Sequence, residues 1–283
     1  MLLLGAHLSI AGGVSQAFAR AEELGCTAMQ IFTKNASQWR SKPLPATEIE
    51  AFAAAWGKSQ VASVTAHDSY LINLASAEGD KRSRSLAAFI DEMERCAFLG
   101  IPGLVMHPGA HLGAGEDVGL QRIAEAMRSI FAAAPAQVSV LLENTAGQGS
   151  YLGHRFEHLA EIMERVPDGR FGVCFDTCHA LAAGYDLSSA EGYQATMSEF
   201  DRLVGTEHIA AFHLNDSLKE RGSRVDRHAQ IGQGAVSLEV FAALMADERF
   251  TKVPKLLETA PGDDNCFHLA SLSLLRQMAE KQA

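Results

Sequence analysis

The sequence predicts an α/β protein with a single (β/α)8 TIM barrel over residues 1–283, and three observations support this prediction. The chain has 283 residues, close to the roughly 250 residues of a typical barrel of this class. Short aliphatic or β-branched runs recur along the whole chain, separated by segments with helical periodicity. No Pro/Ser-rich linker or shift in composition divides the chain. A doubly wound open sheet is the structural alternative, because it has the same alternation of elements.

Eight apolar runs are predicted to be the strands of this barrel. Their apolar residues are continuous rather than alternating, which is typical of parallel strands covered on both faces. The predicted strands are residues 2–6, 27–32, 61–66, 103–106, 138–142, 172–175, 209–212 and 255–257.

The segments between these runs are predicted to be helices. Residues 14–24 and 86–99 have apolar side chains at helical spacing, and each segment stops before a glycine. Thr47-Glu48-Ile49-Glu50 has the pattern of a capping box for a helix that ends near Trp56. Similar patterns predict helices at about residues 120–133, 156–166, 191–204, 238–245 and 267–278.

Composition and charge narrow the class of protein. No apolar run approaches the ~20 residues needed to cross a bilayer, so no membrane segment is expected. The first residues lack the basic region of a secretory leader, and the five cysteines are scattered, which suits reduced thiols in a cytoplasmic protein. The formal charge of −10 argues weakly against a polyanionic partner.

Polar side chains follow almost every predicted strand. In chain order they are His7, Thr33-Lys34, His67, His107, Glu143, Asp176, His213 and Glu258. Barrel active sites lie at the carboxyl ends of the strands, so these side chains are expected around one rim. A single histidine after a strand is more often structural than functional, but ligand-type residues after six successive strands, from the third to the eighth, favour a site.

Two further groups extend this set. Asp176 and His179 stand three residues apart where a strand is predicted to give way to a loop. Asp226 and His228 stand two residues apart in the longest connection, at about residues 215–237, which could equally be a mobile solvated loop. The full candidate ligand set is His67, His107, Glu143, Asp176, His179, His213, Asp226, His228 and Glu258.

Five imidazoles and four carboxylates predict a metal centre. Mixed nitrogen and oxygen ligands suit Zn²⁺ or Mn²⁺ at a hydrolytic site. The cysteines lack the paired spacing of structural zinc sites, so Cys174 and Cys178 are interpreted as packing residues. With one bridging carboxylate, nine ligands are enough for about three metal ions. Such a cluster concentrates positive charge at the rim despite the acidic chain, and phosphate is the obvious substrate group.

Several longer motifs surround these positions. They are GAHLS at residues 5–9, FTKN at 32–35, HDSYLINL at 67–74, HPG at 107–109, ENTAGQG at 143–149, DTCH at 176–179, HLND at 213–216 and GSRVDRH at 222–228. These motifs resemble those of deoxyribonuclease IV (endonuclease IV), a family of bacterial apurinic/apyrimidinic endonucleases, and the resemblance runs essentially end to end. One departure is Ser37, where relatives can carry a long basic side chain.

The resemblance implies a DNA-repair enzyme on an α/β barrel with three zinc ions, one of which could be replaced by Mn²⁺. Such an enzyme cleaves the phosphodiester bond 5′ to an abasic site in duplex DNA, leaves a 3′-hydroxyl and a 5′-deoxyribose phosphate, and trims blocked 3′ ends. Carried over by position, one zinc is held by His67, His107 and Glu143, a second by Glu143, Asp176, His213 and Glu258, and the third by His179, Asp226 and His228.

The resemblance also suggests catalytic and DNA-binding roles. Glu143 or Glu258 is expected to orient or deprotonate the attacking water. Tyr70 and Leu71 are candidates for side chains wedged into the damaged duplex. The candidate DNA contacts are Lys34, Tyr70, Leu71, Arg224 and Arg227, with Lys42 as a further candidate for a phosphate contact. The expected partner is damaged duplex DNA, and the expected state is a monomer in the bacterial cytoplasm.

Two other functions fit part of the pattern. A sugar isomerase or epimerase with one divalent metal would need only Glu143, Asp176, His213 and Glu258, and would leave the other five ligand-type residues without a role. A non-catalytic protein that binds lesions or stores metal is the second alternative. The number of metal ions per chain distinguishes the isomerase from the nuclease, and strand scission distinguishes the nuclease from the binding protein.

Overall fold

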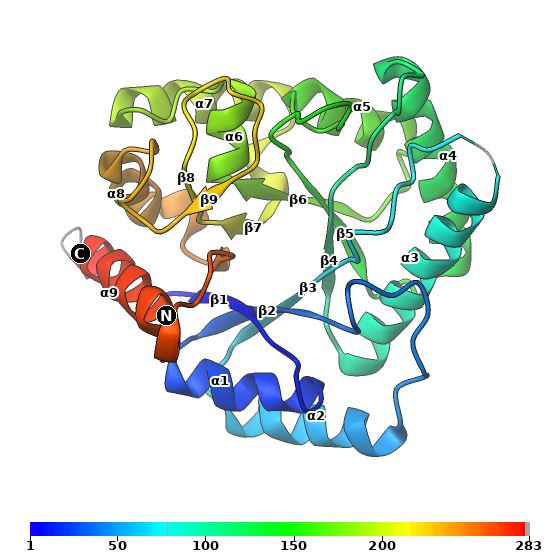
Figure 1. Ribbon diagram of the computed structural model, residues 1–283, viewed down its shortest axis with the longest axis horizontal. Helices are drawn as coiled ribbons and strands as arrows, with labels where there is room; N and C mark the ends of the chain where they lie inside the picture. Colours follow the sequence, from blue (N-terminus) through cyan, green and yellow to red (C-terminus); the bar gives the residue numbers. More distant parts are fainter. Residues whose placement is uncertain (78, 281–283) are drawn as a thin grey trace.

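A closed barrel of eight parallel strands forms the centre of the computed structural model, which describes residues 1–77 and 79–280 (Figure 1). The order around the barrel is β1-β10-β7-β6-β5-β4-β3-β2. The strands are β1 (Leu4–Leu8), β2 (Ala28–Phe32), β3 (Ser63–His67), β4 (Gly103–Met106), β5 (Ser139–Glu143), β6 (Phe171–Asp176), β7 (Ile209–His213) and β10 (Lys255–Leu257). The predicted barrel is confirmed, and the open sheet is wrong.

Barrel closure depends on the pairing of the first and last strands. Leu4 of β1 is in register with Lys255 of β10, and Gly5 of β1 is in register with Ala28 of β2. A Cβ atom at Gly5 would lie 1.7 Å from the carbonyl oxygen of Ala28, so only glycine allows this approach. The first strand is Leu4–Leu8 rather than residues 2–6. Because it ends at Leu8, His7 lies inside β1 instead of after it.

Helices surround the barrel and bury its outer face (Figure 1). The α-helices are α1 (Ala17–Glu23), α2 (Ala46–Lys58), α3 (Asp80–Leu99), α4 (Glu116–Ala133), α5 (Phe156–Arg165), α6 (Thr177–Ala183), α7 (Ala190–Leu203), α8 (Leu238–Ala246) and α9 (Cys266–Glu280). Short 3₁₀ turns lie at Val14–Gln16, Thr206–His208, Glu248–Phe250 and Asp263–Asn265. Glu78 and Lys281–Ala283 lie outside the described residues, so a single domain over residues 1–283 stays a prediction.

The predicted capping box at the start of α2 is wrong. The helix begins at Ala46 after Pro45, and no side chain caps its first turn. Glu48 instead accepts hydrogen bonds from the backbone N–H and the hydroxyl of Ser15, each at 3.1 Å. The carboxylate therefore ties α2 to the 3₁₀ turn before α1, because a tertiary donor is available to it. Among the described residues, no helix combines the length and apolar character needed to span a membrane.

Lys255 in β10 provides a test of the barrel's packing. Its side chain is buried, and its ammonium group donates to the carbonyls of Phe250 at 2.6 Å and Val253 at 3.1 Å. Burial lowers the pKa of Lys255 to about 8. Below pH 8 the lysine is charged in both folded and unfolded chains, so the folded chain carries the full burial penalty. As the pH rises from 8 to about 10.5, the folded chain loses its proton first, and the penalty disappears.

We therefore expect the free energy of unfolding to rise by up to about 3 kcal/mol between these pH values, relative to Lys255→Met. Denaturant unfolding of both proteins across the alkaline range measures this difference. Parallel stability curves for the two proteins would show that the folded lysine titrates normally.

Candidate metal centre

Six of the nine candidate ligands lie at the carboxyl ends of barrel strands. Each is either the last residue of its strand or the next residue along the chain. In order they are His67 (β3), His107 (β4), Glu143 (β5), Asp176 (β6), His213 (β7) and Glu258 (β10). Because the strands are parallel, these ends meet at one mouth of the barrel. The strand-end argument therefore located this set correctly.

An apolar cluster lies beneath these side chains inside the barrel. It contains Val105, Leu141, Cys174 and Ala211, all buried and separate from the main core. Each of these residues comes two positions before a candidate ligand, so it shares the ligand's face of the strand. Burial raises the pKa of Cys174 to about 12, which keeps its thiol protonated. These residues thus form an apolar layer beneath the polar mouth of the barrel.

The sequence predicted a loop after Asp176, but the structure has the helix α6 there. This helix carries the next candidate ligand, His179. Asp176 is the N-cap of α6, and its Oδ1 accepts a hydrogen bond from the backbone N–H of His179 at 2.7 Å. The first helical turn carries His179 back over the barrel mouth. One carboxylate therefore starts the helix and also lies in the site.

Asp216 organises the long connection after β7 through hydrogen bonds to its backbone. Its carboxylate is buried and accepts hydrogen bonds from the backbone N–H groups of Ser217, Gly232, Gly234 and Val236. A short antiparallel pair, β8 (Asp216–Ser217) and β9 (His228–Ala229), lies within the connection. The segment is thus held as one unit, with Asp226 and His228 brought to the barrel mouth.

Replacing Asp216 by alanine is expected to loosen this connection. Four backbone donors would lose their charged acceptor, and we expect a loss of about 3 kcal/mol in the free energy of unfolding. Hydrogen exchange should accelerate at residues 217–236. Asp201→Ala is the matched control, because that exposed carboxylate bonds only Thr206. Equal stability losses in the two variants would contradict the role of Asp216.

The nine candidate ligands gather into three groups at the barrel mouth. In each group the possible ligand atoms lie within 4.8 Å of one another. The groups are His67, His107 and Glu143; Glu143, Asp176, His213 and Glu258; and His179, Asp226 and His228. These are the same three sets that the family resemblance implied.

Glu143 lies at the centre of the arrangement and is fully buried. Its Oε2 is 3.2 Å from Nε2 of both His67 and His107. Its Oε1 is 3.0 Å from Nδ1 of His213 and 3.1 Å from Nδ1 of His179. Each carboxylate oxygen therefore faces a different pair of imidazoles, which is the geometry of a bridging ligand.

The electrostatics of the centre favour positive charge. Although burial opposes ionisation, the nearby charges of His213 and His107 hold the pKa of Glu143 well below its usual range. Burial likewise opposes charge on His67, but hydrogen bonds to Asp68 and Glu143 raise its pKa to about 10. Asp226, despite its burial, has its pKa lowered to about 2 by a hydrogen bond from His179. The buried carboxylates thus favour positive charge at this centre.

The donor set fits divalent metal ions. Nε2 of His228 is buried with no hydrogen-bond partner among the described residues, although it lies 3.3 Å from Oδ1 of Asp226. A cation between these atoms would satisfy both. Cys178 lies near Asp176 and His228 in a further possible donor group, and burial raises its thiol pKa to about 12.

Two asparagines support the ligands and were not recognised from the sequence. The amide nitrogen of Asn215 donates to Oδ2 of Asp176 at 2.6 Å and to Oε2 of Glu258 at 3.4 Å. The side chain of Asn144 bonds both the backbone N–H and the carbonyl of Asp176. Both belong to quoted motifs, but only their placement beside carboxylates reveals this function.

Two adjoining cavities of about 420 and 220 Å³ open onto the centre. Tyr70 and Arg227 line both of them. The side chain of Tyr70 is 71% exposed, and its ring packs against Phe32 at a centroid distance of 5.4 Å. Leu71 is half-buried, and Arg224 is exposed with a positive φ of 53°. These four predicted contacts, Tyr70, Leu71, Arg224 and Arg227, are thus at least partly exposed.

Lys34 is not placed to contact a DNA phosphate, so this prediction is corrected. Only 1% of its side chain is exposed, and its ammonium group lies 2.7 Å from Oδ2 of Asp91 and 3.4 Å from Oε1 of Glu92. The lysine comes two residues after the end of β2, where the chain is still packed against α3. It therefore anchors the segment after β2 instead of reaching solvent.

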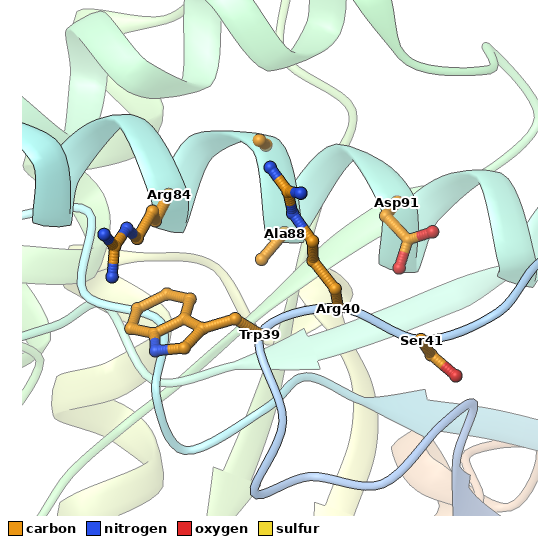
Figure 2. A pocket seen from close by; sticks show the side chains of 7 residues that line it. Trp39, Arg40, Ser41, Arg84, Ala88 and Asp91 are labelled. Atoms are coloured by element: carbon orange, nitrogen blue, oxygen red, sulfur yellow. The ribbon is translucent and has the colours of Figure 1, made fainter.

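A cavity of about 670 Å³, larger than either of the two that open onto the centre, lies away from the candidate ligands, between α3 and the segment after β2. Figure 2 shows the indole of Trp39 beside Arg84 of α3, with the side chain of Arg40 reaching across the same helix near Ala88. None of the nine candidate ligands lines it. The volume of a cavity therefore does not identify the site that carries the candidate ligands.

Comparisons with known proteins agree with this geometry. Residues 18–277 match the family model described as a xylose isomerase-like TIM barrel. The chain is 52% identical over 282 residues to a probable endonuclease 4 of Geobacter sulfurreducens, covering 99% of this chain and 95% of that protein. It is also 52% identical over 276 residues to a probable endonuclease 4 of Chloroflexus aggregans, covering 97% and 96%.

A solved structure is similar over nearly its whole length. The crystal structure of endonuclease IV from Thermus thermophilus superposes with a TM-score of 0.86 at 37% sequence identity. The alignment covers 98% of this chain and 99% of that chain. The similarity therefore includes the complete barrel and the connections that carry the candidate ligands.

Proposed function

The chain belongs to the endonuclease IV family of deoxyribonucleases, and from this premise we propose that it repairs DNA by hydrolysing the phosphodiester bond 5′ to an abasic site. The products are a 3′-hydroxyl and a 5′-deoxyribose phosphate, and blocked 3′ ends are trimmed by the same centre. The proposed cofactors are three Zn²⁺ ions per chain, with Mn²⁺ possible at one position. We propose that the enzyme acts as a monomer in the cytoplasm.

The observation that carries this proposal is the set of three neighbouring donor groups, two of which share Glu143. A mononuclear isomerase would use one group of four ligands. It would leave the buried group at His67 and His107 and the group at His179 and His228 without function. Clustered divalent ions suit phosphodiester hydrolysis, because they stabilise charge on both the attacking and the leaving oxygen.

Glu143 and Glu258 have different proposed roles in the reaction. When bound, the metal ions would supply Lewis acidity and make hydroxide available near neutral pH. Both oxygens of the fully buried Glu143 face imidazoles, so we assign it to holding the centre together. The side chain of Glu258 is 16% exposed and lines the larger cavity. It is the better placed of the two to orient the attacking water and to accept its proton.

Side chains at the cavity rim are proposed to engage the DNA. Tyr70 and Leu71 follow the ligand His67 directly, and the exposed ring of Tyr70 can stack against a base or fill the gap at an abasic site. Arg227 and Arg224 are exposed on the connection that carries two ligands, where guanidinium groups can contact phosphates. Lys34 has no part in this interface.

Replacing Tyr70 by alanine is expected to weaken DNA binding more than catalysis. Loss of one stacking ring removes about 1–3 kcal/mol, so KM for an abasic duplex should rise about 10-fold or more, with a smaller change in kcat. Steady-state incision assays measure both constants. Tyr70→Phe keeps the ring and should behave like the wild type. A fall in kcat alone would show that Tyr70 acts in catalysis rather than in DNA binding.

The decisive experiment is incision of a duplex that carries one abasic analogue, with and without added Zn²⁺ or Mn²⁺. Analysis of the ends should show a 3′-hydroxyl and a 5′-deoxyribose phosphate. Metal analysis of the pure protein should give about three ions per chain, whereas about one would favour the isomerase. Persistent binding without scission in the fully loaded protein would favour a lesion-binding protein.

A further inference from the structure

Gln30 is a buried polar residue within the apolar strand β2 that no ligand set includes. It is fully buried, and it is in register with His7 of β1 and Thr65 of β3. A buried carboxamide needs hydrogen-bond partners, because leaving it unsatisfied costs about 1–3 kcal/mol. The partners of Gln30 are all residues of the candidate centre or its wall.

The two polar atoms of the Gln30 carboxamide contact three side chains. Nε2 lies 2.7 Å from Oε1 of Glu258 and 3.0 Å from Nδ1 of His7. Oε1 lies 2.9 Å from Nε2 of His213. An ionised carboxylate only accepts hydrogen bonds, so the atom beside Glu258 must be the amide nitrogen. The surroundings therefore fix the orientation of the amide.

This orientation decides which nitrogen of His213 carries hydrogen. The carboxamide oxygen only accepts, so Nε2–H of His213 donates to it. Nδ1 of the same ring lies 3.0 Å from an oxygen of Glu143 and 3.0 Å from an oxygen of Glu258. Metal-bound histidines use the nitrogen without hydrogen, while the other N–H is held by an acceptor. Gln30 thus presents Nδ1 of His213 to the group of four ligands.

His7 accepts the second hydrogen of the amide nitrogen. Because Nδ1 of His7 is the acceptor, its ring hydrogen lies on Nε2. That nitrogen is buried with no hydrogen-bond partner among the described residues, and His7 lines the larger cavity together with Glu258.

We infer that Gln30 is a positioning residue, which fixes the metal-facing nitrogen of His213 and holds Glu258 and His7 by hydrogen bonds from its amide nitrogen. This inference rests on the proposed function, because it assigns Gln30 to the same centre. Gln30 touches neither metal nor substrate; it acts through His213, Glu258 and His7.

Two substitutions separate the contacts of Gln30. Gln30→Met keeps the length of the side chain but removes every hydrogen bond. Gln30→Glu keeps an acceptor for His213 but removes the donors to Glu258 and His7. Thr65→Val is the matched control, since it changes a buried polar side chain at the paired position of β3. Circular dichroism establishes that each full-length variant is folded.

The readouts are Zn²⁺ affinity from competition with a chromophoric chelator, the hydrogen position on His213 from ¹⁵N NMR of the zinc-loaded protein, and incision kinetics. Gln30→Met should lose the defined Nε2–H form of His213 and bind the weakest-held zinc about 10- to 100-fold less tightly. Gln30→Glu should retain that form of His213 but lower kcat more than it raises KM. Thr65→Val should match the wild type in all three.

Wild-type zinc affinity and an unchanged His213 spectrum in Gln30→Met would overturn the inference. So would equal effects of Gln30→Met and Thr65→Val. Failure of the wild type to cleave abasic DNA would overturn the proposed nuclease instead, because zinc affinity and the His213 spectrum judge Gln30 without any cleavage.

Discussion

Replacing Glu143 by glutamine is expected to abolish DNA cleavage while leaving the barrel folded. The substitution keeps the shape of the side chain but removes its charge and replaces one acceptor oxygen with an NH₂ group. Because the two oxygens of Glu143 face different pairs of imidazoles, both adjoining ligand groups are damaged at once. We expect kcat/KM to fall by about 1,000-fold or more, equivalent to about 4 kcal/mol of barrier.

Single-turnover incision of an abasic duplex measures this loss, and metal analysis of the purified variant should show fewer bound ions. Glu48→Gln is the matched control, since it makes the same chemical change at a carboxylate that joins α2 to Ser15 and belongs to none of the donor groups. Wild-type turnover in Glu143→Gln would rule out a bridging role for this residue.

Removal of metal by a chelator is expected to eliminate cleavage and to lower thermal stability together. The centre holds Glu143 and Asp176 fully buried, where burial penalises their charges. Bound cations would offset this penalty, and their binding energy adds to the stability of the folded chain. For a chain of this length, each kcal/mol changes Tm by about 2–4 °C, so a decrease of about 10 °C or more is expected.

Calorimetry of the chelated and the zinc-restored protein tests this expectation beside incision assays on the same samples. Adding Zn²⁺ back should recover both Tm and cleavage, whereas Mg²⁺ should recover neither, because imidazole nitrogens suit zinc better. Full activity in protein shown to be free of metal would contradict the assigned centre. An unchanged Tm would show that the imidazole protons alone balance the buried carboxylates.

The fold and the ligand positions could be predicted because they depend on local patterns. The continuous apolar runs identified the strands, and parallel strands necessarily bring their carboxyl ends together, so Glu143 and Glu258 could be placed near each other despite their separation in sequence. Helix α6 escaped this reasoning. It has only seven residues, too few for a periodic pattern, and it begins directly at the end of β6.

The supporting contacts could not be predicted, because they depend on side-chain directions in three dimensions. Gln30 stands in an apolar run and looks like an exception to it, and nothing local indicates that His213 and Glu258 lie beside it. Lys34 follows a strand as the ligands do, yet its side chain turns toward Asp91 and Glu92 on α3. Position along a strand therefore locates a residue at the rim without specifying its partner.

The place of β10 between β1 and β7 has a consequence for protein synthesis. Until this late segment is synthesised, the nascent polypeptide exposes two unpaired strand edges and lacks Glu258, the last of the candidate metal ligands along the chain. The proposed four-ligand group can therefore be completed only after β10 has been synthesised. Truncated products that end before β10 should be substrates for quality-control proteases rather than partially active enzymes.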